Sequence, residues 1–164
     1  MVAAGLTDFL LAIIGASASF IGLLFVGLTF VTSGESDTSH EFIDKRLLAE
    51  SSYAALLNIF FVSIVALIPD NNLGYVLLVM ALFGLGGTLR LFKISEKKHR
   101  TNVTLLISTL VYVGEGIYAL YVLFQNSSYY IDNYIFMTII LFLFGISLAR
   151  AWELTGIRQH GIKS

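Results

Sequence analysis

Residues 51–89 read SSYAALLNIFFVSIVALIPDNNLGYVLLVMALFGLGGTL, two apolar runs separated only by Pro69, Asp70, Asn71 and Asn72. Each run has about the length, roughly 17 to 25 residues, that an α-helix needs to cross a hydrocarbon core of about 30 Å. Proline cannot continue the first helix, and the Asp and Asn residues that follow it favour a turn. The stretch therefore predicts two antiparallel helices joined by a tight turn, which is the smallest unit of a membrane helix bundle.

The chain contains three further apolar runs and is hydrophobic overall. Of its 164 residues, 57% are hydrophobic and only 13% are charged, which indicates lipid as the surrounding solvent. The first run is interpreted as a retained helix, because residues 1–7 hold no Lys or Arg and the run is too long for a signal peptide. We predict an all-α integral membrane bundle, one domain over residues 1–164, with five transmembrane helices at residues 9–31, 51–68, 73–92, 103–124 and 133–152.

The Lys and Arg residues are segregated along the chain. Positive charges near helix ends stay on the cytoplasmic side of a membrane. With five crossings, all ten fall on that side: Lys45, Arg46, Arg90, Lys93, Lys97, Lys98, Arg100, Arg150, Arg158 and Lys163. Four or six crossings would split them between the two sides. The sequence thus predicts an N-terminus outside and a C-terminus in the cytoplasm, in the inner (cytoplasmic) membrane of the cell.

Several classes of chemistry are excluded or lack support. Without cysteine there are no disulfides, thiolate metal sites or cysteine nucleophiles. Glu96 and His99 have the E-x-x-H spacing of some metal sites, but such sites need further ligands from neighbouring helices. No basic face is left free for nucleic acid. We predict no metal, no cofactor, no nucleic-acid partner and no enzymatic activity, since catalysis inside a membrane requires a polar cluster.

Glu115, between Gly114 and Gly116, is the first candidate for a functional residue. It lies about 18 Å and 14 Å from the two ends of its predicted helix, close to the middle of a bilayer. A carboxylate there costs on the order of 3 kcal/mol or more, so the side chain should face protein or water, or be protonated. Two interpretations stay open: an ion- or proton-coupling site, and a neutral glutamic acid hydrogen-bonded to a neighbouring helix.

Other polar residues extend this intramembrane polar site. Three of them precede Glu115 at helical spacing on one face of its helix: Thr104, Ser108 and Tyr112. Depth along the other helices places further polar residues near the level of Glu115, with Asn58 somewhat nearer the cytoplasm: Ser17, Ser19, Asn58, Ser63 and Thr138. The predicted site comprises Glu115, Tyr112, Ser108, Ser19 and Asn58. Arg90 lies about 15 Å shallower, so no cationic partner for Glu115 is identified.

Charged residues at the predicted cytoplasmic helix ends are interpreted as interfacial. A basic group around the third loop attracts anionic headgroups at about 1 kcal/mol per charge, although orientation alone explains it: Arg90, Lys93, Lys97, Lys98 and Arg100. Arg150 and Glu153 stand on either side of Trp152 and are spaced to form an ion pair on one helix face. This pair is expected to fix the helix end at the interface; a gate or a partner-docking site is the alternative.

Small residues recur four apart in two of the predicted helices: Gly15 and Ser19, Ala18 and Gly22, and Gly84 and Thr88. This spacing lets helix backbones approach closely in lipid. We therefore expect these residues to pack helices within the bundle, and a homo-oligomer seam or a gating hinge is the alternative.

The segment before the second crossing has its own pattern. From Phe42 onward, apolar positions recur at helical intervals among charged residues. The pattern predicts a short interfacial helix leading into the second crossing, with Thr38 and Glu41 capping its start.

Three segments resemble those of a group of small, uncharacterised bacterial multi-pass membrane proteins: GLLFVGLTF at residues 22–30, LIP at residues 67–69 and ARAWELTG at residues 149–156. That group has no known activity to transfer to any residue. The resemblance therefore implies a prokaryotic membrane setting and leaves the function open.

Two functions from different classes fit these observations. The first is an ion or proton pore or transport unit. A wide pore would require a homo-oligomer, because five short helices are too few to enclose an aqueous path. The second is an accessory or regulatory subunit of a larger membrane complex, without transport activity of its own. Glu115 favours the first, and the lack of a second intramembrane charge or an inverted repeat favours the second. The expected partners are the lipid bilayer and either further copies or another membrane protein.

Overall fold

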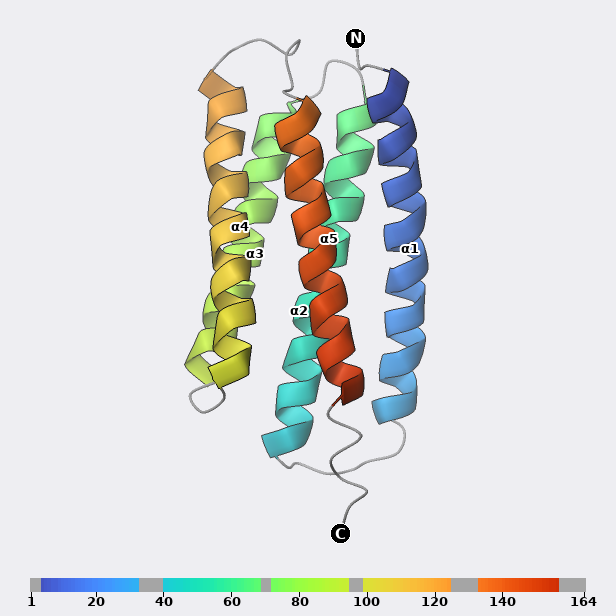
Figure 1. The fold of residues 1–164 in the computed structure, drawn as a ribbon, viewed down its shortest axis with the longest axis vertical. Helices are drawn as coiled ribbons and strands as arrows, with labels where there is room; N and C mark the ends of the chain where they lie inside the picture. Colours follow the sequence, from blue (N-terminus) through green and yellow to red (C-terminus); the bar gives the residue numbers. More distant parts are fainter. Residues whose placement is uncertain (1–3, 33–39, 69–71, 95–98, 125–132, 157–164) are drawn as a thin grey trace.

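The computed structural model describes residues 4–32, 40–68, 72–94, 99–124 and 133–156. These residues form five α-helices: α1 (Ala4–Thr32), α2 (His40–Leu67), α3 (Leu73–Ile94), α4 (His99–Phe124) and α5 (Asn133–Gly156). The helices run side by side along the long axis of the molecule, with the two chain termini at opposite ends (Figure 1). The end that holds the start of α1 is called the amino-terminal end below, and the other is called the carboxy-terminal end.

All five helices are long and apolar enough to cross a membrane. The candidate spans, searched within the described residues, are Gly5–Gly27, Ala49–Leu67, Leu73–Phe92, Leu105–Phe124 and Tyr134–Trp152. The predicted all-α architecture of five apolar helices is therefore confirmed for this part of the chain. Five such helices support a multi-pass membrane protein.

The second helix begins earlier than predicted. It is continuous from His40 to Leu67, so the residues expected to form a short helix leading into the second crossing are helical but join that crossing without a break. The physical reason is that residues 40–67 contain neither proline nor glycine, and nothing in the sequence interrupts the helix. The proposed cap by Thr38 and Glu41 lies outside the described side chains.

The turn between α2 and α3 follows the prediction from Pro69 and the residues after it. The amide of Ile68 donates to the carbonyl of Val65 at 3.0 Å, closing α2 with a tightened turn. At the start of α3, the amide of Tyr75 donates to the carbonyl of Asn72, also at 3.0 Å. The chain thus reverses within a few residues, and α2 and α3 pack as an antiparallel hairpin.

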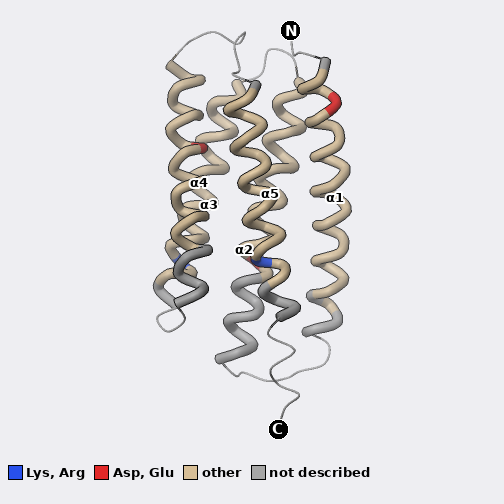
Figure 2. Tube along the Cα trace, viewed as in Figure 1, with Lys and Arg blue, Asp and Glu red and all other residues tan. Residues whose placement is uncertain are grey.

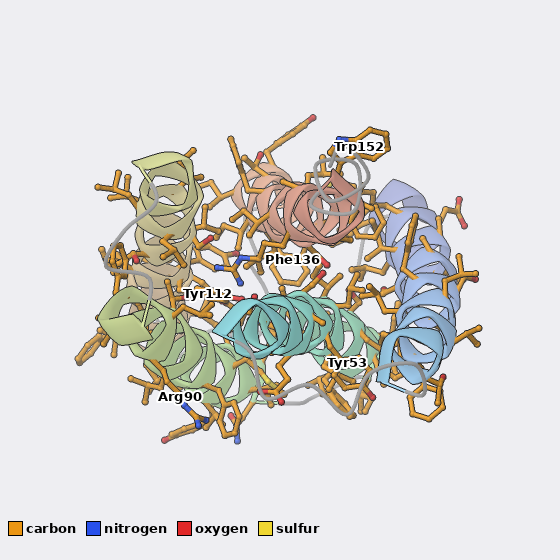
Figure 3. The ribbon with its side chains drawn as sticks, turned by 90° about the horizontal axis from the view of Figure 1, so that it is seen from below. Tyr53, Arg90, Tyr112, Phe136 and Trp152 are labelled. Carbon is orange, nitrogen blue, oxygen red and sulfur yellow. The ribbon has the colours of Figure 1, made fainter. Side chains whose placement is uncertain are left out.

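Helix α2 occupies the middle of the bundle. It packs against α1, α3 and α5, while α4 packs against α3 and α5. The end-on view shows α2 between α3 and α1, with α5 across from it and α1 at one edge of the bundle (Figure 3). Helix α1 contacts only α2 and, more weakly, α5, so it is the most peripheral of the described helices.

Apolar side chains cover the outside of the bundle as well as its interior. Large hydrophobic side chains are exposed on every face: Leu23 and Phe25 on α1, Phe61 on α2, Leu82 and Phe83 on α3, Ile117 on α4 and Phe142 on α5. Charged residues are sparse along the described length of the bundle (Figure 2). Soluble proteins do not expose contiguous apolar surface on this scale, so the outer surface is suited to lipid.

Candidate functional site

Glu115 lies in the interior of the bundle. Its side chain on α4 has no exposed surface, and Asn58 of α2 is also buried, at 3% exposure. The Asn58 side-chain amide Nδ2 donates to Glu115 Oε2 at 3.0 Å. The carboxyl group thus faces protein, as its position in an apolar helix requires.

Each partner in this bond has one side-chain oxygen without a hydrogen bond. Glu115 Oε1 and Asn58 Oδ1 are both buried, and neither has a hydrogen-bond partner within the described residues. Both atoms are acceptors when the acid is ionised, so the amide and carboxyl cannot satisfy one another fully. Either oxygen could accept a further hydrogen bond, and protonation of the carboxyl would add a donor.

Tyr112 and Ser108 continue the site along α4. Both side chains are buried, so the stripe predicted on this helix points into the bundle; the side chain of Thr104 lies outside the described residues. The ring of Tyr112 lies directly against the backbone of α3, where a Cβ added to Gly84 would overlap its atoms. The absence of a side chain at Gly84 therefore allows this close approach. Figure 3 shows Tyr112 in the interior of the bundle.

Arg150 is the second buried charge. Its side chain on α5 is only 2% exposed, and Nη1 donates to the carbonyl of Ser51 at 3.3 Å. This burial against α2 was not predicted from the sequence. Arg150 lies two residues before the candidate span ends at Trp152, so its expected position at the membrane interface stays a prediction. The side chain of Glu153 is not among those described, so its pairing with Arg150 stays a prediction.

The two buried charges lie at different depths. Counted from the amino-terminal helix ends, Asn58 and Glu115 lie about 14 Å deep and Arg150 about 26 Å deep. Tyr112 lies between these levels and is within electrostatic reach of both Arg150 and Glu115. Side chains tilt toward the N-terminus of their own helix, so Arg150 on α5 and Tyr112 on antiparallel α4 extend toward each other.

Two serines beside Arg150, Ser52 of α2 and Ser147 of α5, join the two helices by hydrogen bonds. Ser52 Oγ donates to the carbonyl of Ser147 at 2.8 Å, and Ser147 Oγ donates to the carbonyl of Ser52 at 3.1 Å. With the bond from Arg150 to Ser51, three interhelical contacts fall within about one turn of α5. This cluster was not predicted from the sequence; the available signal was that Ser147 and Arg150, three residues apart, share one face of an apolar helix.

The polar and apolar parts of the interior are separated along its length. A buried polar layer lies roughly 21 to 26 Å from the amino-terminal end: Ser51, Ser52, Thr88, Ser108, Ser147 and Arg150. Beyond Glu115, toward the amino-terminal end, the interior is filled mainly by apolar side chains: Ile59, Val62, Leu73, Leu77, Phe136 and Ile140. Among described residues, Ser63 and Tyr118 are the buried polar side chains in that half. Most buried polar groups therefore lie on the carboxy-terminal side of Glu115, where apolar side chains such as Leu91 and Leu105 are buried as well.

Ser19 does not join the site. Its side chain is exposed on α1, where Oγ donates to the carbonyl of Gly15 at 2.8 Å. Ser17, two positions earlier and on the opposite side of α1, is the serine of this helix that is buried. Depth alone had placed both serines near Glu115, but α1 has no contact with α4. Thr138 is likewise exposed.

The predicted basic group is only partly described. Arg90 is exposed near the carboxy-terminal end of α3. Lys97 and Lys98 lie outside the described residues, as do the side chains of Lys93 and Arg100. Their contact with lipid headgroups stays a prediction.

The small-residue pattern holds in one helix and fails in the other. Gly84 packs α3 closely against α4, as expected. Gly15 and Gly22 are exposed on α1, and a Cβ added to either would meet nothing within 4 Å. The prediction that this face of α1 packs within the bundle is therefore wrong, because α1 contacts its neighbours through another face.

No family model, curated protein or solved structure matches the chain. The described residues also contain no group of three or more His, Cys, Asp or Glu side chains placed to hold a metal ion. What the protein does is therefore inferred from the arrangement of its own side chains.

Proposed function

We propose that the five helices insert the protein into the cell membrane and that it moves protons or a small cation by way of Glu115. In this arrangement the amino-terminal end faces outward and the carboxy-terminal end faces the cytoplasm. The sequence supports this orientation, since five crossings place every Lys and Arg on the cytoplasmic side.

The observation that carries the proposal is the pair of Glu115 and Asn58. A carboxyl group inside a membrane bundle is costly, and such groups mark ion or proton pathways by default. Here the amide of Asn58 binds one carboxyl oxygen at 3.0 Å, while Glu115 Oε1 and Asn58 Oδ1 still lack donors among the described residues. Binding of a proton or a cation at this pair is therefore favourable.

The direction of access follows from the segregated interior. Ser108 and Tyr112 lead from the polar layer to Glu115, whereas Leu77 and Phe136 belong to the apolar half beyond it. We infer that protons or cations reach Glu115 from the cytoplasmic side, because most of the buried polar side chains lie in that half of the interior. Because all these side chains are closely packed, a narrow proton route fits the interior better than a wide aqueous pore.

The test is ion flux into liposomes that contain the purified protein. Glu115→Gln keeps the size of the side chain and an acceptor for the Asn58 amide, but removes the ionisable group. We expect the wild type to carry protons or cations and the variant to match protein-free liposomes. Glu50→Gln is the matched control, because it makes the same change at an exposed carboxyl on α2 and should leave flux unchanged.

Two results would contradict the proposal. Equal flux with and without the Glu115 carboxyl would remove this residue from the pathway. A pure wild-type protein that passes neither protons nor Na⁺ or K⁺ in either direction would exclude transport by the chain itself. The mass of the purified particle, measured on the same sample, then distinguishes a single chain from an oligomer.

One observation favours the second candidate, an accessory subunit of a larger membrane complex. The small residues of α1 are exposed, and Gly15 and Gly22 have open space above them. Such a face lets another transmembrane helix approach closely. A chain without flux that nevertheless requires Gly15 and Gly22 for stable assembly with a second membrane protein would support this candidate.

A further inference from the structure

The buried polar layer lies between the carboxy-terminal end of the bundle and Glu115. Four helices contribute to it: Ser51 and Ser52 of α2, Thr88 of α3, Ser108 of α4, and Ser147 and Arg150 of α5. Arg150 is the charged member of this layer and lies about 12 Å from Glu115 along the bundle axis. An ion that approaches Glu115 through the bundle from the carboxy-terminal end therefore has to pass Arg150.

Three backbone carbonyls in this layer have no lone pair left for a metal ion. A carbonyl oxygen has two lone pairs, and within an α-helix one of them accepts the amide four residues on. The carbonyl of Ser51 also accepts from Arg150 Nη1 at 3.3 Å. The carbonyl of Ser147 also accepts from Ser52 Oγ at 2.8 Å, and the carbonyl of Ser52 accepts from Ser147 Oγ at 3.1 Å. All three oxygens are thus fully used.

A metal ion in this layer finds no replacement for its hydration shell. Selective channels replace the water around Na⁺ or K⁺ with carbonyl oxygens or with charged carboxylates. The hydroxyls of Ser52 and Ser147 are neutral, and they lie beside a guanidinium that stays charged at every physiological pH. Two like unit charges about 4 Å apart repel each other by several times the thermal energy near a protein interior. The layer therefore opposes a metal ion through both its ligands and its charge.

A proton does not need such a set of ligands. A hydroxyl group both donates and accepts hydrogen bonds, so a proton can pass by exchange between neighbouring hydroxyls and does not have to stop beside the guanidinium. Ser108 and Tyr112 are both buried, and they precede Glu115 on one face of α4. Ser108 lies in the polar layer, and Tyr112 lies between that layer and Glu115. These two hydroxyls are therefore placed to carry protons where a metal ion is excluded.

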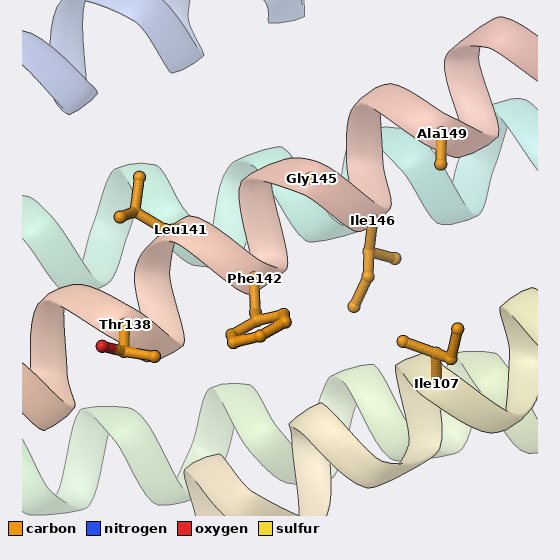
Figure 4. A pocket seen from close by; sticks show the side chains of 7 residues that line it. All are labelled: Ile107, Thr138, Leu141, Phe142, Gly145, Ile146 and Ala149. Carbon is orange, nitrogen blue, oxygen red and sulfur yellow. The ribbon is translucent and has the colours of Figure 1, made fainter.

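A pocket on the outer surface offers metal ions no better surroundings. It lies between α4 and α5, where Ile107, Phe142 and Ile146 are among the residues that line it (Figure 4). Apart from Thr138, every lining residue is apolar. The Thr138 hydroxyl donates to the carbonyl of Tyr134 at 2.7 Å. A metal ion in this pocket would therefore lack a set of oxygen ligands as well.

We propose that the site at Glu115 takes protons and not metal ions, and that Arg150 is the residue that sets this specificity. Arg150 excludes Na⁺ and K⁺ on the carboxy-terminal side of the carboxyl group, together with the fully used carbonyls beside it. This specificity rests on the transport by Glu115 proposed above and decides which ion is moved.

Ion uptake by liposomes that contain the purified full chain tests this specificity. Gradients of H⁺, Na⁺ and K⁺ are applied in turn, and each ion is followed with its own internal dye. We expect the wild type to take up H⁺ and to match protein-free liposomes for Na⁺ and K⁺. Arg150→Gln should retain H⁺ uptake and raise Na⁺ or K⁺ uptake at least about tenfold, because the repulsion of one unit charge is removed.

Three further variants make the test specific to the charge of Arg150. Arg150→Met also removes the charge while filling much of the space, so it should admit metal ions as Arg150→Gln does. Arg150→Lys keeps the charge and should still exclude them. Arg90→Gln makes the same change at an exposed arginine of α3 and should behave like the wild type. Retained H⁺ uptake shows in each case that the variant is folded.

The outcomes separate this specificity from the transport on which it rests. A wild type that takes up Na⁺ or K⁺ as readily as H⁺ overturns the specificity and leaves transport by Glu115 in place. A wild type that takes up none of the three ions overturns the transport itself. Continued exclusion of Na⁺ and K⁺ in Arg150→Gln and Arg150→Met, with H⁺ uptake intact, overturns the role of Arg150. Admission of metal ions by Arg150→Lys overturns the role of its charge.

Discussion

A Gly84→Ala variant should be less stable than the wild type by about 1 to 3 kcal/mol, the usual range for overpacking a close helix contact. The added methyl group overlaps the ring of Tyr112, which is buried between α3 and α4 and has no open space into which to retreat. In most helical positions alanine would instead stabilise relative to glycine. The measurement is reversible unfolding in mixed micelles, followed by circular dichroism.

Two further variants make the Gly84 prediction specific. Gly86→Ala places the same methyl group two residues away in open space, and should change stability by no more than about 0.5 kcal/mol. Combining Gly84→Ala with Tyr112→Leu should cost less than the sum of the two single changes, because the overlap disappears with the ring. If alanine is tolerated equally at both glycines, the close contact of α3 with Tyr112 does not exist.

Removing the Arg150 side chain should be at least as damaging. Arg150→Ala opens a cavity between α2 and α5 and leaves the carbonyl of Ser51 without its bond from Nη1. Truncation of a large buried side chain costs about 2 to 5 kcal/mol. Arg150→Met fills much of the space without a charge and should lose less, because burying a guanidinium is itself costly.

Arg90 provides the control for the Arg150 series. It is the exposed arginine of α3, so Arg90→Ala should change the free energy of unfolding by no more than about 0.5 kcal/mol. Unfolding of all three variants in the same micelles gives the comparison. A loss in Arg150→Ala no greater than that in Arg90→Ala would show that the Arg150 side chain is not packed between α2 and α5.

The sequence predicts those parts of the fold that depend on the residues of one helix at a time. Apolar length fixes the five helices, and Pro69 with its neighbours fixes the hairpin of α2 and α3. A carboxyl group in the middle of an apolar helix has to face the bundle, and Glu115 does so. Depth counting also placed Asn58 near Glu115, where the structure has the two hydrogen-bonded.

The parts that failed depend on which helix faces meet. Helix α1 is apolar all round, so nothing in its pattern separates Ser17, which is buried, from Ser19, which is exposed. The burial of Arg150 was not predicted, because it depends on which face of α5 packs against α2. Contacts between helices far apart in sequence, such as Ser52 with Ser147, leave no periodic signal in either helix.

We predict that five helices cross a membrane with all basic residues on one side. Because the chain has no native cysteine, labelling of single introduced cysteines tests this topology directly. Single cysteines are placed at Asn71 and Ser127 for one side and at Ser36 and Lys97 for the other, and intact cells are treated with an impermeant maleimide. We predict labelling at residues 71 and 127 from outside, and at residues 36 and 97 only after the cells are permeabilised. Labelling of residue 36 or 97 in intact cells, or protection of residue 71 or 127, would contradict the orientation and the five crossings on which it depends.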